Sequence, residues 1–188
     1  NDEFDVLLFA RRDIEIAEIP DFIRVIGQEA FAYCQNIQKV IFKDNSKLVL
    51  IEEYAFHNCS LKSITIPSSV CEIKKNAFSC CYNLSNITFS IDSKLRIIEK
   101  DFFTSCNIES FTIPPKVERI KHFSSMYLKH FNFMPNNNFV FYNDTFLLGK
   151  SDLESDVHDV LIYSRKDVEN IIIPSFIKRI KAYSFHLC

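Results

Sequence analysis

The architecture follows from the segment Leu61-Lys-Ser-Ile-Thr-Ile-Pro-Ser-Ser-Val-Cys-Glu-Ile-Lys-Lys-Asn-Ala-Phe-Ser-Cys-Cys81, because its pattern of apolar residues recurs along the chain. Written as a template it reads L-x-x-I-x-I-P-x-x-V-x-x-I-x-x-x-A-F-x-x-C. Copies begin at residues 14, 37, 61, 84, 108, 128 and 168, with spacings of 23, 24, 23, 24, 20 and 40 residues. A near-constant period of this length is typical of a solenoid, in which successive units stack along one axis.

Each unit divides into two predicted elements. Template positions 4 and 6 are apolar and position 5 is polar, which is the period of a strand with one buried face. Pro67 lacks a backbone N–H donor and therefore ends this strand. Val70, Ile73, Ala77 and Phe78 follow at the spacing of one helical face, over a length too short for an independent helix. We predict a right-handed solenoid whose units of about 23 residues each contribute a strand and a short helix or 3-10 turn.

Two template positions hold residues with a structural explanation. The phenylalanine after the alanine is expected to fill the interior, and it is represented by Phe31, Phe56, Phe78, Phe103 and Phe185. The last position of the template is expected to form a column along one edge, and it holds Cys34, Cys59, Cys81, Cys106 and Cys188. Small packed hydrophobes, disulfides between neighbouring units and metal ligands are three interpretations of this column. The first is favoured, because the cysteines and histidines have no zinc spacing.

The beginning of the chain repeats a segment of its second half. Residues 5–13 read Asp-Val-Leu-Leu-Phe-Ala-Arg-Arg-Asp, and residues 159–167 read Asp-Val-Leu-Ile-Tyr-Ser-Arg-Lys-Asp, at a constant offset of 154. A second, longer repeat is therefore superimposed on the short one.

The template and the excursion between the sixth and seventh copies resemble the BspA-like class of leucine-rich repeats, known from surface antigens of bacteria and parasitic protists. The excursion contains Asn143-Asp144-Thr145-Phe146-Leu147-Leu148 and the segment 159–167, which resemble the hairpin that such proteins insert between blocks of repeats. The resemblance implies a single leucine-rich-repeat solenoid fragment over 1–188. Its parts are the end of a hairpin segment at 1–13, repeats at 14–134, an inserted β-hairpin at 135–167 and a resumed, truncated repeat at 168–188.

Composition excludes several classes of protein. The 22 basic and 24 acidic residues are scattered and give a net charge of −2, so nucleic acid is not expected as a partner. The sequence has no apolar run of the roughly 18 to 20 residues that a membrane span requires. It begins without methionine and stops within a unit at both ends, so we expect a piece of a longer protein with neighbouring repeats.

No motif for catalysis or cofactor binding stands out. The five histidines are dispersed and are expected at the surface, and no glycine-rich loop for phosphate is present. Asp152, Glu154, Asp156 and Asp159 lack the EF-hand pattern and are interpreted as part of a solvated loop. We therefore expect no enzyme, no cofactor and no metal. Four N-x-[ST] sequons, which begin at Asn58, Asn83, Asn86 and Asn143, favour a secreted or surface protein.

The outward side of the predicted strands is the candidate binding surface, because positions 3 and 5 face solvent where 4 and 6 face the core. These positions form a neutral polar band of Ser63, Thr65, Asn86, Thr88, Ser110, Thr112, His130 and Asn132. The band has two interpretations, as soluble residues that suit a strand or as a ligand-binding face.

The resemblance implies a cell-surface or extracellular antigen or adhesin that binds host-cell or matrix proteins. A cytoplasmic scaffold for protein–protein interactions is the alternative, since unpaired thiols are compatible with a reducing compartment.

Overall fold

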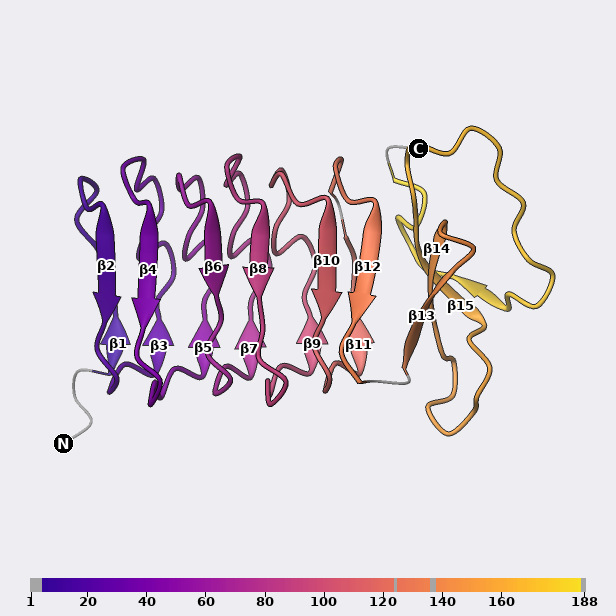
Figure 1. Cartoon of the computed structure of the whole chain (residues 1–188), viewed down its shortest axis with the longest axis horizontal. Coiled ribbons are helices and arrows are strands. Elements are labelled where there is room, and N and C mark those ends of the chain that lie inside the picture. The colour runs from indigo at the N-terminus through magenta and orange to yellow at the C-terminus, as the bar shows by residue number, and fades with distance from the viewer. Residues whose placement is uncertain (1–4, 124, 136–137, 187–188) are drawn as a thin grey trace.

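The chain coils into a stack of parallel turns. The computed structural model describes residues 5–123, 125–135 and 138–186. One row of strands forms the front of the stack in Figure 1, and all pairing within this row is parallel. The front row comprises β2 (Ile16–Ile19), β4 (Lys39–Phe42), β6 (Ser63–Thr65), β8 (Asn86–Thr88), β10 (Ser110–Ile113) and β12 (His130–Phe133).

A second row of short strands lies on another side of each turn. Its strands are also parallel, and it comprises β1 (Val6–Leu7), β3 (Val25–Ile26), β5 (Leu50–Ile51), β7 (Glu72–Ile73), β9 (Ile97–Ile98) and β11 (Arg119–Ile120). Equivalent template positions face each other across neighbouring turns, as Ile51 and Ile73 do. The predicted solenoid is therefore confirmed, and it contains two rows of strands where the template indicated one.

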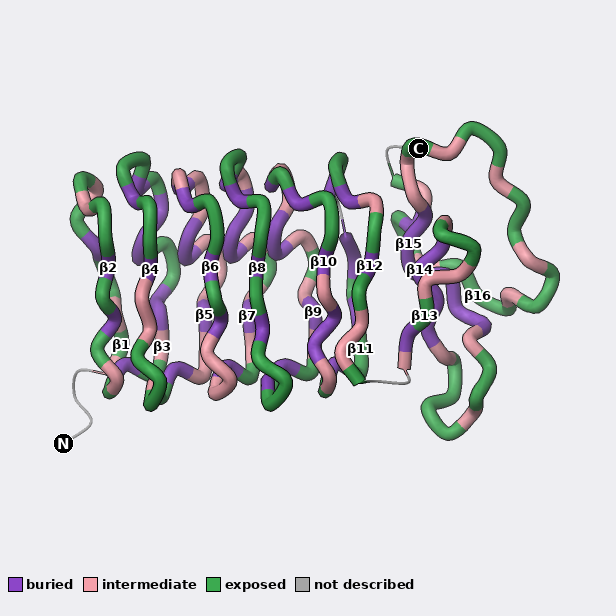
Figure 2. Tube along the Cα trace, viewed as in Figure 1, coloured by how far each residue is buried: buried purple, intermediate pink, exposed green. Residues whose placement is uncertain are grey.

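The core is the space that the turns enclose (Figure 2). Every apolar position of the unit that begins at Leu61 is at most 2% exposed. The rings of Phe31 and Phe56 stack with centroids 4.9 Å apart, and those of Phe56 and Phe78 stack at 5.1 Å. Aromatic contacts of this kind add to the burial of apolar area, which stabilises the stack.

The ring column changes at the fourth full repeat. Phe102 stands there in place of the template alanine, and its ring meets Phe78 edge-on at 6.4 Å. Phe103 is 2% exposed as predicted, but its ring lies beside Phe102 and Phe111. A large residue in the small position thus interrupts the parallel stacking without opening the core.

The cysteine column is buried and hydrogen-bonded. The thiols of Cys59, Cys81 and Cys106 donate to the carbonyls of Phe31, Phe56 and Phe78 at 2.9, 2.9 and 3.1 Å. Each thiol therefore binds the backbone of the preceding turn. The expected column position of Cys188 lies outside the described residues.

The short helix or 3-10 turn predicted for each unit is not confirmed, because the described residues form turns there and no helix. The residues before the template alanine and before the cysteine have positive φ, which a helix forbids; Tyr54 (φ 59°) and Asn58 (φ 54°) are examples. The amides of Phe56 and Asn58 donate to Ala77 and Ser79 in the next turn of the coil, at 2.8 and 2.9 Å. Backbone hydrogen bonds between neighbouring turns of the coil thus replace the hydrogen bonds within one segment that a helix would need.

Three antiparallel strands close the C-terminal end of the stack (Figure 1). They are β13 (Phe139–Tyr142), β14 (Phe146–Gly149) and β15 (Val160–Ser164), and β16 (Arg179–Ile180) joins β15 in parallel. Asn143 and Asp144 turn the chain between β13 and β14 with positive φ at both residues. Asparagine and aspartate tolerate this conformation better than most residues. The predicted division of the chain into blocks stays a prediction.

The two similar segments that lie 154 residues apart in the sequence form equivalent strand pairs. Val6 pairs with Val25 at the start of the coil, and Val160 pairs with Arg179 at its end. The carbonyl of Asp159 accepts the amides of Lys178 and Arg179, as that of Asp5 accepts two amides of its own neighbouring turn. The longer repeat is thus a repeat of structure.

The last unit differs from the template. Its residues 168–178 form no strand, although the pattern predicted a strand ending at Pro174. Ile172 is 88% exposed, whereas Phe185 packs against the small apolar cluster of the hairpin. The hairpin occupies the end of the stack, so residues 168–178 pair with no front-row strand among the described residues.

Replacing Phe78 by alanine should lower the free energy of unfolding by about 3 to 5 kcal/mol, because the fully buried ring leaves a cavity between two turns. Chemical denaturation followed by circular dichroism measures this change. The exposed Tyr82, also changed to alanine, is the control. A loss under about 1 kcal/mol for Phe78→Ala would contradict the assigned core.

Candidate functional site

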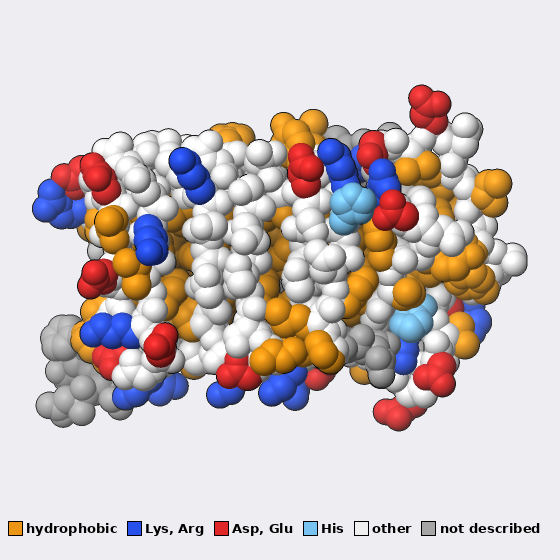
Figure 3. Space-filling view, in the orientation of Figure 1, with side chains coloured by type: hydrophobic (Ala, Val, Ile, Leu, Met, Phe, Trp, Pro, Cys, Tyr) orange, Lys and Arg blue, Asp and Glu red, His pale blue; other side chains and the backbone are white. Residues whose placement is uncertain are grey.

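The front row presents the predicted polar band on one continuous face. Seven of its eight residues are exposed, and Thr112 is half-buried. Ser63 pairs with Asn86, and Thr65 with Thr88, while strands β8 and β10 are in contact. The remaining pairs, formed across β10 and β12, are Ser110 with His130 and Thr112 with Asn132. The structure therefore brings all eight residues onto one face. The middle of this face is mostly white in Figure 3, the colour of uncharged polar side chains and backbone.

Hydroxyl and amide groups dominate this face. The Nδ2 atom of Asn132 donates to Oγ of Ser110 at 2.8 Å, and Nδ2 of Asn86 donates to Oγ1 of Thr88 at 3.2 Å. A hollow of about 410 Å³ is lined by Ser85, Asn86, Asn107, Glu109, Ser110, Thr112 and Asn132. Neutral donors and acceptors of this kind can bind the polar groups of a partner without the desolvation that buried charges require.

The C-terminal end of the band is charged. Nδ1 of His130 lies 3.3 Å from the carboxylate of Asp144 in the hairpin turn, and Nη1 of Arg165 lies 2.7 Å from the same carboxylate. The hairpin therefore borders the face and limits it at this end.

The front face extends beyond the predicted polar band toward the N-terminus. Ile16, Glu18, Lys39 and Ile41 occupy the same outward template positions in the first two units. They are exposed except Ile41, which is half-buried, and they make this end apolar and charged. The template rule that located the polar band also locates these four residues.

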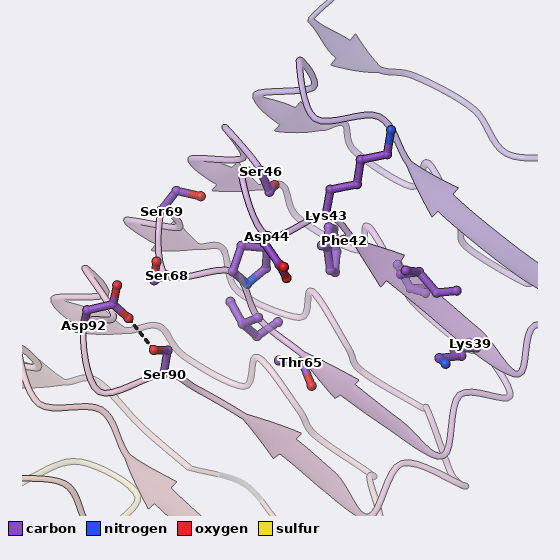
Figure 4. Close-up of a pocket in the computed structure, with 14 residues that line it drawn as sticks. Lys39, Phe42, Lys43, Asp44, Ser46, Thr65, Ser68, Ser69, Ser90 and Asp92 are labelled. Carbon is purple, nitrogen blue, oxygen red and sulfur yellow. Dashed lines mark hydrogen bonds between the residues drawn. The ribbon is translucent and has the colours of Figure 1, made fainter.

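A second hollow, of about 430 Å³, lies where β4 and β6 end (Figure 4). Lys39 and Thr65 reach it from the strands, whereas Asp44, Ser68 and Asp92 come from the turns that follow three successive strands. Ser90 donates a hydrogen bond to Asp92 at its edge. These turn residues carry no periodic signal, so their grouping is visible only in the structure.

The cysteines and histidines of the described part of the chain form no cluster that could hold a metal ion. All six cysteines that the structure describes are free, and burial raises the pKa of the Cys106 thiol. No set of three metal-ligating side chains occurs among the described residues. The expectation of surface histidines is wrong for His122, which is 6% exposed and hydrogen-bonded to Asp101 at 2.9 Å. Burial lowers the pKa of His122, and the Asp101 carboxylate opposes this shift.

Comparison with known proteins agrees with this architecture. The family described as BspA type leucine rich repeat region matches in six copies, over residues 4–128 and 45–154. Among solved structures, the pneumococcal vaccine antigen PcpA is 29% identical, with a TM-score of 0.79 over 91% of this chain and 42% of that chain. A leucine rich repeat protein from T. pallidum is 26% identical, with a TM-score of 0.52 over 56% of this chain and 51% of that chain.

A leucine rich cell surface protein from Faecalibacterium prausnitzii shares the fold at 24% identity, with a TM-score of 0.64 over 92% of this chain and 52% of that chain. The chain thus spans about half the length of the solved proteins that it matches. No curated protein matches it significantly.

Alkylation should distinguish the cysteine column from the two other described cysteines. In native protein we expect iodoacetamide to label the exposed Cys71 first and the half-buried Cys80 more slowly. Cys34, Cys59, Cys81 and Cys106 should react only after unfolding in guanidinium chloride, because they are buried. Peptide mass spectrometry measures the labelling. Disulfide-linked peptides from neighbouring column positions would show that the packed-thiol interpretation is wrong.

Proposed function

Because this chain belongs to the BspA type leucine-rich-repeat family, we propose that it is a non-catalytic binding module of the cell surface, an antigen or adhesin that holds protein partners on its front row of strands. The family and the repeat fold imply protein binding in general. The proposed partners are proteins of host cells or of the extracellular matrix. The proposed location is the cell surface or the extracellular space.

One observation carries the proposal. The eight residues of the polar band pair in register across β6 and β8 and across β10 and β12, and two hollows of about 410 and 430 Å³ adjoin them. Solenoids commonly bind partners on such extended surfaces, where contacts are shared among several repeats. A face that spans several strands is large enough to bury the area that a specific protein interface needs.

The surface location has its own support. The solved structure with 29% identity is that of a pneumococcal vaccine antigen. Three of the four sequons begin at exposed asparagines, namely Asn83, Asn86 and Asn143. As a finding separate from location, the described part of the chain contains no helix long and apolar enough to cross a membrane.

A second candidate is an intracellular protein–protein interaction scaffold. The free state of all six described cysteines favours it, because thiols persist in a reducing compartment. Both candidates use the front face, so they differ in location and in the partner.

Lysines on the front face should weaken partner binding without unfolding the protein. We expect Thr65→Lys, Thr88→Lys and Thr112→Lys together to weaken binding at least about tenfold, because three added charges would have to be desolvated in the interface. Immobilised fibronectin, laminin, fibrinogen and collagen are the probes, and biolayer interferometry measures affinity.

The control adds the same charge elsewhere, at the exposed turn residues Gln28, Asn36 and Asn83. Circular dichroism of both triple variants verifies folding. Equal affinity of the front-face variant and the wild type would show that the front face is not the binding site. Binding of the wild type to none of the four probes would exclude these matrix proteins as partners.

Antibody labelling of intact and permeabilised source cells decides the location. Labelling of intact cells is expected if the protein is exposed at the surface. Labelling after permeabilisation alone would exclude the adhesin and favour the intracellular scaffold.

A further inference from the structure

A cationic hollow lies between the second row of strands and the hairpin, apart from the polar band. Its volume is about 360 Å³, and its walls come from β11, the hairpin strands and β16. Four of its lining residues are cationic, whereas one, Glu118, is acidic. The cations are Arg119, Lys150, Arg179 and Lys181.

Elsewhere along the second row, the turns of the coil neutralise each other's charges. The residues that directly follow β5, β7, β9 and β11 alternate in sign, and they are Glu52, Lys74, Glu99 and Lys121. Nζ of Lys121 lies 2.7 Å from the carboxylate of Glu99. The pKa of Lys74 is raised by its hydrogen bond with Glu72, and the carboxylates of Glu52 and Glu99 act in the same direction. A cation in this row therefore normally has an acid from its own or the adjacent turn beside it.

The alternation ends at the hollow. Lys181 is the equivalent residue after β16, and its half-buried Nζ donates to the carbonyl of Ile120 at 2.8 Å. Burial lowers the pKa of Lys181, and the neighbouring Arg119 and Arg179 lower it further. Where Lys74 is surrounded by carboxylates, Lys181 is surrounded by other cations.

The protein's own acidic groups do little to neutralise the four cations of the hollow. Within residues 5–123, 125–135 and 138–186, no carboxylate lies within 4.0 Å of the charged nitrogens of the four cations. Glu118 is 3.5 Å from Arg96 of the preceding turn. The rest of the lining is largely apolar and includes Phe139, Val160 and Ile162. Arginine and lysine beside an apolar wall attract an anion more strongly than the same groups in open solvent do.

We propose that this hollow binds the side-chain carboxylates of an acidic segment of a protein partner, at a site separate from the front face. The chain's own charge pairs along this row use glutamate carboxylates, which an incoming acidic peptide reproduces. The planar guanidinium groups of Arg119 and Arg179 can each bind a carboxylate through two parallel hydrogen bonds. Lys181 and Lys150 add charge at the wall of the same hollow.

The test uses fluorescein-labelled hexaglutamate and the whole chain, so that it does not depend on the partner of the front face. Fluorescence anisotropy should show saturable binding, which weakens between about 10 mM and about 150 mM salt as screening increases. The double variant Arg119→Ile with Arg179→Val should bind at least about tenfold more weakly. Ile97 and Val25 occupy the equivalent strand positions in this chain, so the variant is expected to fold.

A matched control removes two cations at a distance. Lys62→Ser with Lys94→Ser lowers the net charge equally at two exposed positions that do not line the hollow. This control should bind hexaglutamate as the wild type does, and thermal melts should be alike for all three proteins.

Three results with hexaglutamate would overturn the proposal. They are the absence of peptide binding by the wild type at low salt, equal weakening by both double variants, and unchanged binding by the Arg119 and Arg179 variant. A sulfated heparin oligosaccharide of matched charge is the competing probe. Tighter binding of that probe, lost in the Arg119 and Arg179 variant, would replace the acidic peptide with a sulfated glycan. None of these outcomes bears on the front face, which the threonine variants test independently.

Discussion

Parallel pairing in register between one turn of the coil and the next is the constraint on which the molecule depends. It places each side chain beside its equivalent in the neighbouring turn, as Thr65 lies beside Thr88. A residue type that suits one turn therefore suits the next, and side chains form columns of a single kind. Phenylalanine rings and thiols make the interior columns, while hydroxyl and amide groups make the front face. Binding capacity is consequently spread over several turns.

The same constraint explains what could be predicted from the sequence. The period located the front-row strands, the buried Phe56 and Phe78, and the residues of the polar band, because each is a column. It could not distinguish a short helix from turns at Val70 to Phe78. Both conformations bury the same apolar positions, and they differ in where the backbone amides bond. The amide of Phe78 donates to Phe102 in the next turn, a partner that no spacing within the segment reveals.

Features that break the columns were beyond the reach of the pattern. Phe102 in the alanine position tilts the ring stack, and the hairpin leaves Ile172 and its neighbours without a strand to join. The cationic hollow joins Ile120 to Lys181, which lie 61 positions apart and on either side of the hairpin. A column of equivalent side chains can be inferred from one repeat and the period. Contacts across an interruption can be found only from the coordinates of the turns on both sides of it.

Where the hairpin interrupts the array of repeats, the charges of the flanking turns are not compensated as they are in the rest of the array. Within an unbroken stack, alternating charges in successive turns compensate each other, as Glu99 and Lys121 do. At the hairpin, by contrast, Arg119 of the turn before it neighbours Arg179 and Lys181 of the turn after it, and among the described residues no carboxylate lies within 4.0 Å of their charged nitrogens. The largely neutral polar band of the front face relies on shape and hydrogen bonds, which salt affects little. The hollow at Arg119 and Arg179 relies on Coulomb attraction, which salt screens. Two surfaces of one repeat protein are in this way suited to partners of different chemistry.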